Sequence, residues 1–150
     1  MRHSASLLGL LLVLSVAVSA PAQPGCAPTA PDMEGPFYKP GAPPREATGG
    51  GLTVNGTVKA APTCAPIRGA RVEWWQANPR GNYDDAHRGS LLTGDDGAFR
   101  FETDFPPPYS GRLSHIHVKA RAAGYGPLTT QLYLKGGERA VTFDLVLVKE

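Results

Sequence analysis

Hydrophobic and polar residues alternate in several short stretches of this chain. Leu52, Val54 and Val58 alternate with polar positions, and Phe99 and Phe101 alternate with charged ones. Successive side chains of a β-strand point to opposite faces, so a period of two predicts strands with one buried face. Further strands are predicted at residues 71–76, 112–119, 130–134 and 141–147, with a hairpin turn at 95–97.

No stretch outside the N-terminal segment has apolar residues at helical spacing. Residues 78–90 lack any apolar periodicity and are predicted to form a loop. Short strands separated by turns are typical of two packed sheets, so the predicted fold is all-β, an antiparallel β-sandwich spanning residues 52–150. We find no internal repeat and no second domain.

Prolines recur every few residues between Pro21 and Arg45. Proline fixes φ and lacks a backbone donor, which predicts an extended arm rather than a helix or central strand. Phe37 and Tyr38 within this stretch need a surface to pack on, and three glycines at 49–51 provide a hinge. Residues 23–51 are therefore predicted to be an extended proline-rich N-terminal arm packed on the body.

The first 22 residues have the pattern of a secretory signal peptide. Arg2 precedes an apolar run at 7–18, and small residues follow this run. The signal peptidase could cleave either after Ala20 or after Ala22. A run of twelve residues is shorter than the roughly 20 that a membrane-spanning helix needs. The mature protein is predicted to be secreted or periplasmic, without a membrane anchor.

The charge of the chain argues against nucleic-acid binding, and its cysteine content suggests a disulfide. Loss of Arg2 with the signal leaves 14 basic and 13 acidic residues, a net charge of +1, and no basic cluster supports nucleic-acid binding. Cys26 and Cys64 are the two cysteines of an exported chain, and a disulfide is the simplest interpretation. Lipid attachment at Cys26 is the alternative, although the preceding residues fit a lipoprotein signal poorly.

His115 and His117 flank Ile116 in the strand predicted at 112–119. Residues i and i+2 share a face and lie roughly 6.7 Å apart along a strand, so both imidazoles can reach one metal ion. Ile116 and Val118 then enter the core. Imidazole binds zinc, copper and iron alike, so the pair leaves the metal open, and two surface histidines would have the same spacing.

Tyr83 and Tyr109 are further candidate donors. A phenol with a pKa near 10 needs a strongly Lewis-acidic ion to lose its proton at neutral pH, and ferric iron meets that need. A ferrous site would instead need a carboxylate beside the histidines, and Asp84 and Asp85 stay open for that role.

The ordered motifs of the chain resemble those of the intradiol ring-cleavage dioxygenases, the family of protocatechuate 3,4-dioxygenase and catechol 1,2-dioxygenase. They cover almost all of the mature chain and lie at 34–38, 66–77, 81–83, 93–97, 108–109, Arg112, 115–117 and 130–133. The secretory signal is similar to that of a smaller exported branch. The resemblance implies a β-sandwich enzyme.

The resemblance implies a role for each matched residue. Tyr83, Tyr109, His115 and His117 would bind a non-haem ferric iron, Fe(3+). Tyr109 would leave the metal and take up a proton when a catechol binds. Arg112 and Gln131 would act on the substrate. The reaction would use O2 to cleave the bond between the two hydroxylated ring carbons, giving a cis,cis-muconate in aromatic compound catabolism.

Other interpretations stay open from the sequence. The chain could be a non-catalytic secreted β-sandwich binding module, or a secreted copper- or zinc-binding protein that uses His115 and His117. It lacks a helical N-terminal segment like the one through which catechol 1,2-dioxygenases dimerise, and homo-oligomerisation is left open. The sequence also leaves open which catechol is the substrate. His87 matches no ligand position of the family and is predicted to be exposed.

Overall fold

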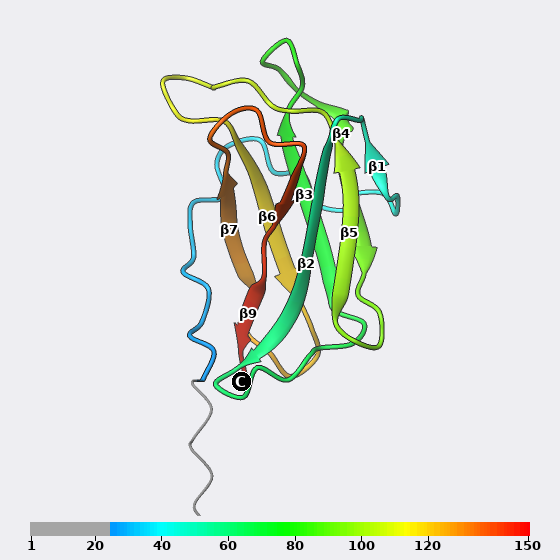
Figure 1. Cartoon of the computed structure of the whole chain (residues 1–150), viewed down its shortest axis with the longest axis vertical. Helices are drawn as coiled ribbons and strands as arrows, with labels where there is room; N and C mark the ends of the chain where they lie inside the picture. The colour runs from blue at the N-terminus through cyan, green and yellow to red at the C-terminus, as the bar shows by residue number, and fades with distance from the viewer. Residues whose placement is uncertain (1–24) are drawn as a thin grey trace, which may run out of the picture.

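The alternating stretches form two facing β-sheets in a computed structural model that describes residues 25–150 (Figure 1). One sheet contains β1 (Ala47–Thr48), β2 (Leu52–Ala61), β5 (Ala98–Thr103), β8 (Ala140–Thr142) and β9 (Leu145–Val148). The other has the order β4 (Tyr83–Leu92), β3 (Arg71–Ala77), β6 (His115–Arg121) and β7 (Leu128–Tyr133). The predicted all-β, two-sheet architecture is confirmed.

The predicted signal peptide at 1–22 lies outside the described residues. Within residues 25–150, no helix has the length and apolar character needed to cross a membrane.

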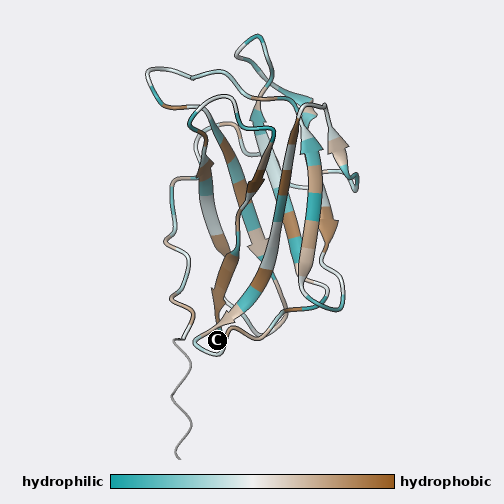
Figure 2. Ribbon diagram, viewed as in Figure 1, coloured by the Kyte–Doolittle hydropathy of each residue, from teal (hydrophilic) through white to brown (hydrophobic). Residues whose placement is uncertain are grey.

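The core lies between the sheets and follows the alternation of the sequence. Along β5, buried and exposed residues alternate strictly, and Figure 2 shows this as bands of opposite hydropathy. Trp74 of β3 stacks on Phe101 of β5 with ring centroids 4.1 Å apart, which joins the two sheets. The indole N–H of Trp74 donates to Thr48 Oγ1 over 2.9 Å, so its one polar atom is satisfied inside the core.

The prediction of a loop at 78–90 is wrong from Tyr83 onward, because β4 begins at that residue. This strand lies at the end of its sheet, beside β3, and is half exposed, so it needs no apolar periodicity. A glycine stands at position 89 of this strand for a packing reason. A Cβ at this position would lie 2.5 Å from the indole of Trp74.

The prediction of an antiparallel sandwich is wrong for part of one sheet. β1 pairs with β5 in parallel, and β2 pairs in parallel with both β8 and β9. The single strand predicted at 141–147 is also split, because Phe143 and Asp144 belong to neither β8 nor β9. Asp144 Oδ1 instead accepts the backbone N–H of Thr57 over 2.9 Å, replacing a ladder hydrogen bond with a side-chain one.

Residues 25–45 run along β7 and then across the outer face of the β4-β3-β6-β7 sheet. Asp32 N donates to the carbonyl of Thr129 over 2.9 Å, which continues the sheet beyond its β7 edge. Tyr38 then packs on Trp75, with ring centroids 4.9 Å apart, and its ring lies 3.8 Å from Lys119 Nζ. This sheet is consequently covered on both faces, which explains the nearly continuous burial of β3 and β6.

The predicted disulfide is confirmed: Cys26 and Cys64 are bonded, at a sequence separation of 38. A loop of this length contributes about 4 kcal/mol in the chain-entropy model. We expect Cys64→Ser to lower the free energy of unfolding by a few kcal/mol at most and to speed proteolysis before Gly49, measured by urea titration and limited proteolysis. Reductant should have the same effect on the wild type and none on the variant; equal protease resistance would contradict this role.

Candidate metal centre

The candidate ligands meet at one end of the sandwich, where the loops at 78–82 and 104–114 lie together, opposite the C-terminus (Figure 1). Tyr83 is the first residue of β4 and His115 the first of β6. Tyr109 lies in the loop between β5 and β6, where its backbone exchanges two hydrogen bonds with Arg112. The four ligand candidates therefore come from three separate parts of the chain.

Three of the four candidate donor atoms converge. Tyr83 Oη lies 3.0 Å from His117 Nε2 and 3.5 Å from His115 Nε2. Two ligands bound at right angles to one ion, with bonds of about 2.1 Å, are about 3 Å apart. Tyr109 lies beside them, with its ring perpendicular to that of Tyr83 and the centroids 5.4 Å apart. The spacing therefore fits a shared metal ion.

The surroundings of the histidines leave Nε2 free to coordinate. His115 Nδ1 is 2.7 Å from the Leu113 carbonyl and must donate to it, so Nε2 carries the lone pair. The His117 ring stacks on Trp75 at 5.0 Å, and Gly35 leaves room for it on the other side, since a Cβ there would lie 3.2 Å from the imidazole. Burial, with the proximity of His115 and of the Arg112 guanidinium, lowers the pKa of His117 to about 4. Its imidazole is neutral near pH 7, as a metal ligand must be.

Burial has the opposite consequence for Tyr83. Desolvation and the proximity of Tyr109 raise the pKa of Tyr83 to about 12, although Arg112 opposes the shift. The phenol therefore stays protonated without a metal, and only a strongly Lewis-acidic ion would release the proton at neutral pH. Phe37 from the arm stacks on the Tyr83 ring, with centroids 4.3 Å apart, and fixes its orientation.

A cavity of about 320 Å³ opens over these donors. Its lining includes all four ligand candidates and Arg112, together with Met33, Gly35, Pro36, Phe37 and Ser110. Gln131 lies behind Arg112 rather than in the lining. Its Oε1 accepts from Arg112 Nη2 over 2.8 Å and its Nε2 donates to the Met33 carbonyl over 2.7 Å. Gln131 therefore orients Arg112 and anchors the arm.

Sequence reasoning missed the other residues that hold Arg112. Tyr133 Oη accepts from Arg112 Nη2 over 2.6 Å and donates to Asp32 Oδ2 over 2.9 Å. Met33 Sδ lies 3.6 Å from Arg112 Nη1. Tyr133 follows Gln131 by two residues, so the alternation of β7 places both on one face and could have identified it.

The prediction that His87 is exposed is wrong. Only 13% of its side chain is accessible, and both ring nitrogens face carboxylates, those of Asp84 and Asp104. Its two partners are 20 residues apart in the sequence, so no local pattern could have shown this arrangement.

The residues present fit a hard, strongly Lewis-acidic metal. In residues 25–150, no group of three or more His, Cys, Asp or Glu side chains is arranged to hold a metal ion, so a metal at this site would need the phenols. The carboxylates left open by the sequence are engaged elsewhere: Asp84 binds His87 and Asn78, and Asp85 pairs with Lys39 at 3.2 Å. Two imidazoles and two phenols match ferric iron better than zinc or copper.

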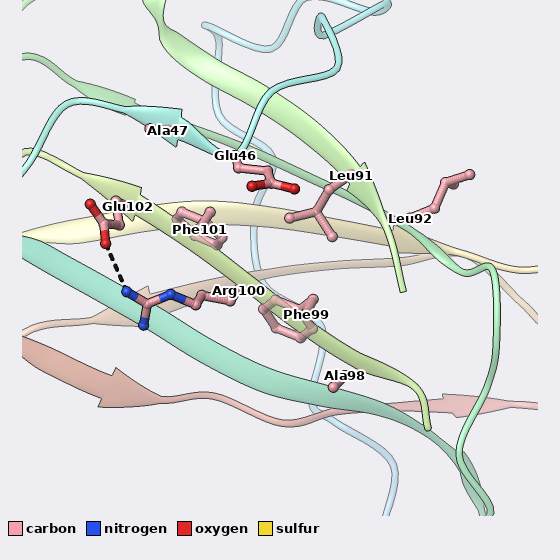
Figure 3. A pocket seen from close by; sticks show the side chains of 9 residues that line it. All are labelled: Glu46, Ala47, Leu91, Leu92, Ala98, Phe99, Arg100, Phe101 and Glu102. Carbon is pink, nitrogen blue, oxygen red and sulfur yellow. Dashed lines mark hydrogen bonds and ion pairs between the residues drawn. The ribbon is translucent and has the colours of Figure 1, made fainter. Parts of the chain in front are cut away.

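A second hollow, of about 510 Å³, lies between β1, β4 and β5 (Figure 3). Its polar side chains are Glu46, Arg100 and Glu102, and the last two form an ion pair at 2.7 Å. With no histidine or tyrosine in its lining, this hollow lacks the donors of the candidate metal centre.

Comparison with known proteins identifies relatives of this chain. The family model described as "Dioxygenase" matches residues 33–148. A chlorocatechol 1,2-dioxygenase from Cupriavidus pinatubonensis is 33% identical over 142 aligned residues, which cover 72% of this chain and 55% of that enzyme. The chain thus spans about half the length of the curated relatives it matches.

Solved structures show the same likeness. The dioxygenase domain of a dioxygenase–carbohydrate-binding protein fusion from Streptomyces sp. SirexAA-E is 38% identical, with a TM-score of 0.76. That alignment covers 83% of this chain and all of that domain. Chlorocatechol 1,2-dioxygenase from Pseudomonas putida is 26% identical, with a TM-score of 0.71, over 80% of this chain and 72% of that one.

Proposed function

We propose that this chain, which belongs to the intradiol ring-cleavage dioxygenase family, cleaves a catechol-type ring with O2 at a non-haem ferric iron. The bond between the two hydroxylated carbons breaks, and both oxygen atoms of O2 enter the product, a cis,cis-muconate. No external reductant is needed. The observation that carries the proposal is the convergence of Tyr83 Oη with the Nε2 atoms of His115 and His117 in one cavity.

When bound, ferric iron would supply Lewis acidity toward the two catechol oxygens and the electronic coupling needed for the ring to react with O2. His115 and His117 would hold it through neutral Nε2 atoms, and Tyr83 and Tyr109 through phenolate oxygens. Tyr109, which lies in the loop between β5 and β6, is the proposed acceptor of a proton from the incoming catechol.

Arg112 is the proposed partner of the negative charge that develops on the substrate. It lines the cavity, and its hydrogen bonds to Gln131 and Tyr133 fix the guanidinium before a substrate arrives. A preorganised cation stabilises charge without the cost of reorientation. Met33 and Phe37 form an apolar wall that would exclude water from the ring.

We also propose that the protein is exported and acts in the periplasm or outside the cell, with residues 1–22 removed. The signal-like sequence and the Cys26–Cys64 disulfide support this location, because disulfides persist in oxidising compartments.

The proposed function is tested by metal analysis of protein purified without added metal, followed by oxygen uptake with catechol. We expect iron, and one O2 consumed per catechol with the absorbance of a muconate appearing. Zinc-loaded protein is the matched control and should consume no O2. Copper or zinc in the purified protein would favour the alternative of a copper- or zinc-binding protein. If the protein contains iron and binds catechol but takes up no oxygen, a non-catalytic binding module would be favoured.

A further inference from the structure

The ladder between β3 and β4 is interrupted next to Tyr83. Ala77 pairs with Tyr83, but the next pair is Trp75 with Arg88. Residues 84–87 therefore bulge from β4 opposite the single residue Gln76. Pairing with β3 does not fix the strand immediately after Tyr83, so side chains must hold it there.

The side chain and backbone of His87 hold the bulge at residues 84–87 in place. Its backbone N–H donates to Asp84 Oδ1 over 2.9 Å, and its Nδ1 lies 2.7 Å from the same oxygen. Asn78 Nδ2 binds the other oxygen of Asp84 at 2.8 Å. The bulge is thereby closed on itself, from the loop before Tyr83 to the strand after it.

The second ring nitrogen of His87 reaches a different part of the chain. His87 Nε2 lies 3.0 Å from Asp104 Oδ2, and Asp104 is the first residue after β5. From there the chain runs through three prolines at 106–108 to Tyr109. Proline has no N–H to donate, so this segment makes few backbone hydrogen bonds of its own, and its position depends on its ends. Asp104 is one of those ends.

We propose that His87 is a positioning residue for the iron site: its imidazolium cross-links the Tyr83-bearing bulge to the Tyr109-bearing segment and so sets the spacing of the two phenols. The inference rests on the proposed function, because it concerns the two tyrosines as ligands. His87 does not line the cavity, and its two ring nitrogens bind carboxylates rather than a ligand candidate. It acts through Asp84 and Asp104.

The cross-link needs the charged form of His87, because only an imidazolium can donate from both ring nitrogens. Burial opposes that form, but the hydrogen bonds and charges of Asp84 and Asp104 outweigh burial and raise the pKa of His87. The nearby cations are engaged elsewhere: Lys39 and Arg88 pair with Asp85, and Arg45 donates to the Ala86 carbonyl.

The sign of the pH dependence follows from the raised pKa. The stabilisation by His87 is fully present below the pKa of the unfolded chain, near 6.5, and is lost as the pH rises through the higher pKa of the folded protein. At alkaline pH a neutral ring can donate to only one of the two carboxylates, so the link between Asp84 and Asp104 through His87 is broken. The spacing of the phenols should then loosen.

The test uses full-length protein and the affinity for ferric iron, measured by competition with a chelator. His87→Gln is expected to weaken iron binding by about 10- to 100-fold at pH 6, the range for loss of a residue that orients a ligand. The loss should be smaller at a pH above the folded pKa of His87. In a Tyr109→Phe background, His87→Gln should cost a clearly smaller factor than in the wild type, because part of its action is through Tyr109.

Lys59→Met is the matched control. Lys59 lies on β2, away from the site, and this substitution removes its ion pair with Asp144. It should leave iron affinity and its pH profile unchanged. If His87→Gln does not fold, Asp104→Asn serves instead: an amide can donate to a neutral ring, so the alkaline loss of affinity should disappear. An iron affinity unaffected by His87→Gln, or an equal loss with and without Tyr109, would overturn the role of His87. Wild-type protein that binds no iron would instead overturn the proposed function.

Discussion

Tyr83→Phe and Tyr109→Phe are each expected to weaken the visible absorption of the iron-loaded protein and to impair turnover. Electron transfer from a phenolate to ferric iron gives a broad visible band and a reddish colour, which zinc cannot produce because its d shell is filled. Tyr83 has a pKa raised to about 12, so only a bound Lewis acid would make its phenolate at neutral pH. Loss of either phenol removes one source of the band.

The two substitutions should differ when a catechol is added without oxygen. In the wild type, a catechol that takes the place of Tyr109 should shift the band, and admission of oxygen should restore it as product leaves. Tyr109→Phe should change this shift more than Tyr83→Phe does, since Tyr109 is the phenol proposed to leave.

The matched control is Tyr125→Phe, which removes the same atom at the far end of β6, after Arg121. Its spectrum and turnover should equal those of the wild type. A colourless iron-replete protein, or a spectrum that ignores both Tyr83→Phe and Tyr109→Phe, would refute the assignment of the phenols as ligands.

Arg112→Leu is expected to keep the iron and its colour but to lower turnover by about 10²-fold or more, the effect of removing one preorganised charge-stabilising donor. Arg112 lines the cavity without being a metal ligand, and Gln131 and Tyr133 hold its Nη2 at 2.8 and 2.6 Å. Arg112→Lys should recover only part of the rate, because an ammonium cannot reproduce the planar fork of donors.

Arg121→Leu provides the comparison, since Arg121 is an exposed arginine at the end of β6 that is farther from Arg112. Steady-state oxygen uptake, with iron content measured on the same samples, separates an effect on the reaction from an effect on the metal. Near wild-type turnover in Arg112→Leu would reassign Arg112 to the surface, and loss of iron would make it a structural support of the metal centre.

The local alternation of residues determined much of the fold. Leu52, Val54 and Val58 are fully buried on β2, and Ile116 and Val118 enter the core from β6. The histidines beside Ile116 consequently share the opposite face, as expected from a period of two. These features depend only on neighbours along the chain, so the sequence is sufficient to predict them.

Edge strands and breaks in strands could not be predicted in this way. β4 carries no alternation, because it is half exposed and has Gly89 where Trp74 needs space. The strand predicted at 141–147 breaks at Phe143 and Asp144, where the Asp144 side chain accepts the backbone N–H of Thr57 on β2. The parallel pairing of β2 with β8 and β9 likewise depends on contacts between distant segments.

For the candidate metal centre, the sequence by itself determined which residue types are present and that His115 and His117 face the same way. Only the tertiary structure brought Tyr83 Oη within 3.0 Å of His117 Nε2, placed Tyr133 behind Arg112, and put His87 between Asp84 and Asp104. The physical reason is the range of the interactions. Side-chain direction along a strand is a local property of the backbone, whereas the meeting of two loops depends on how the sheets pack, and that packing involves the whole chain.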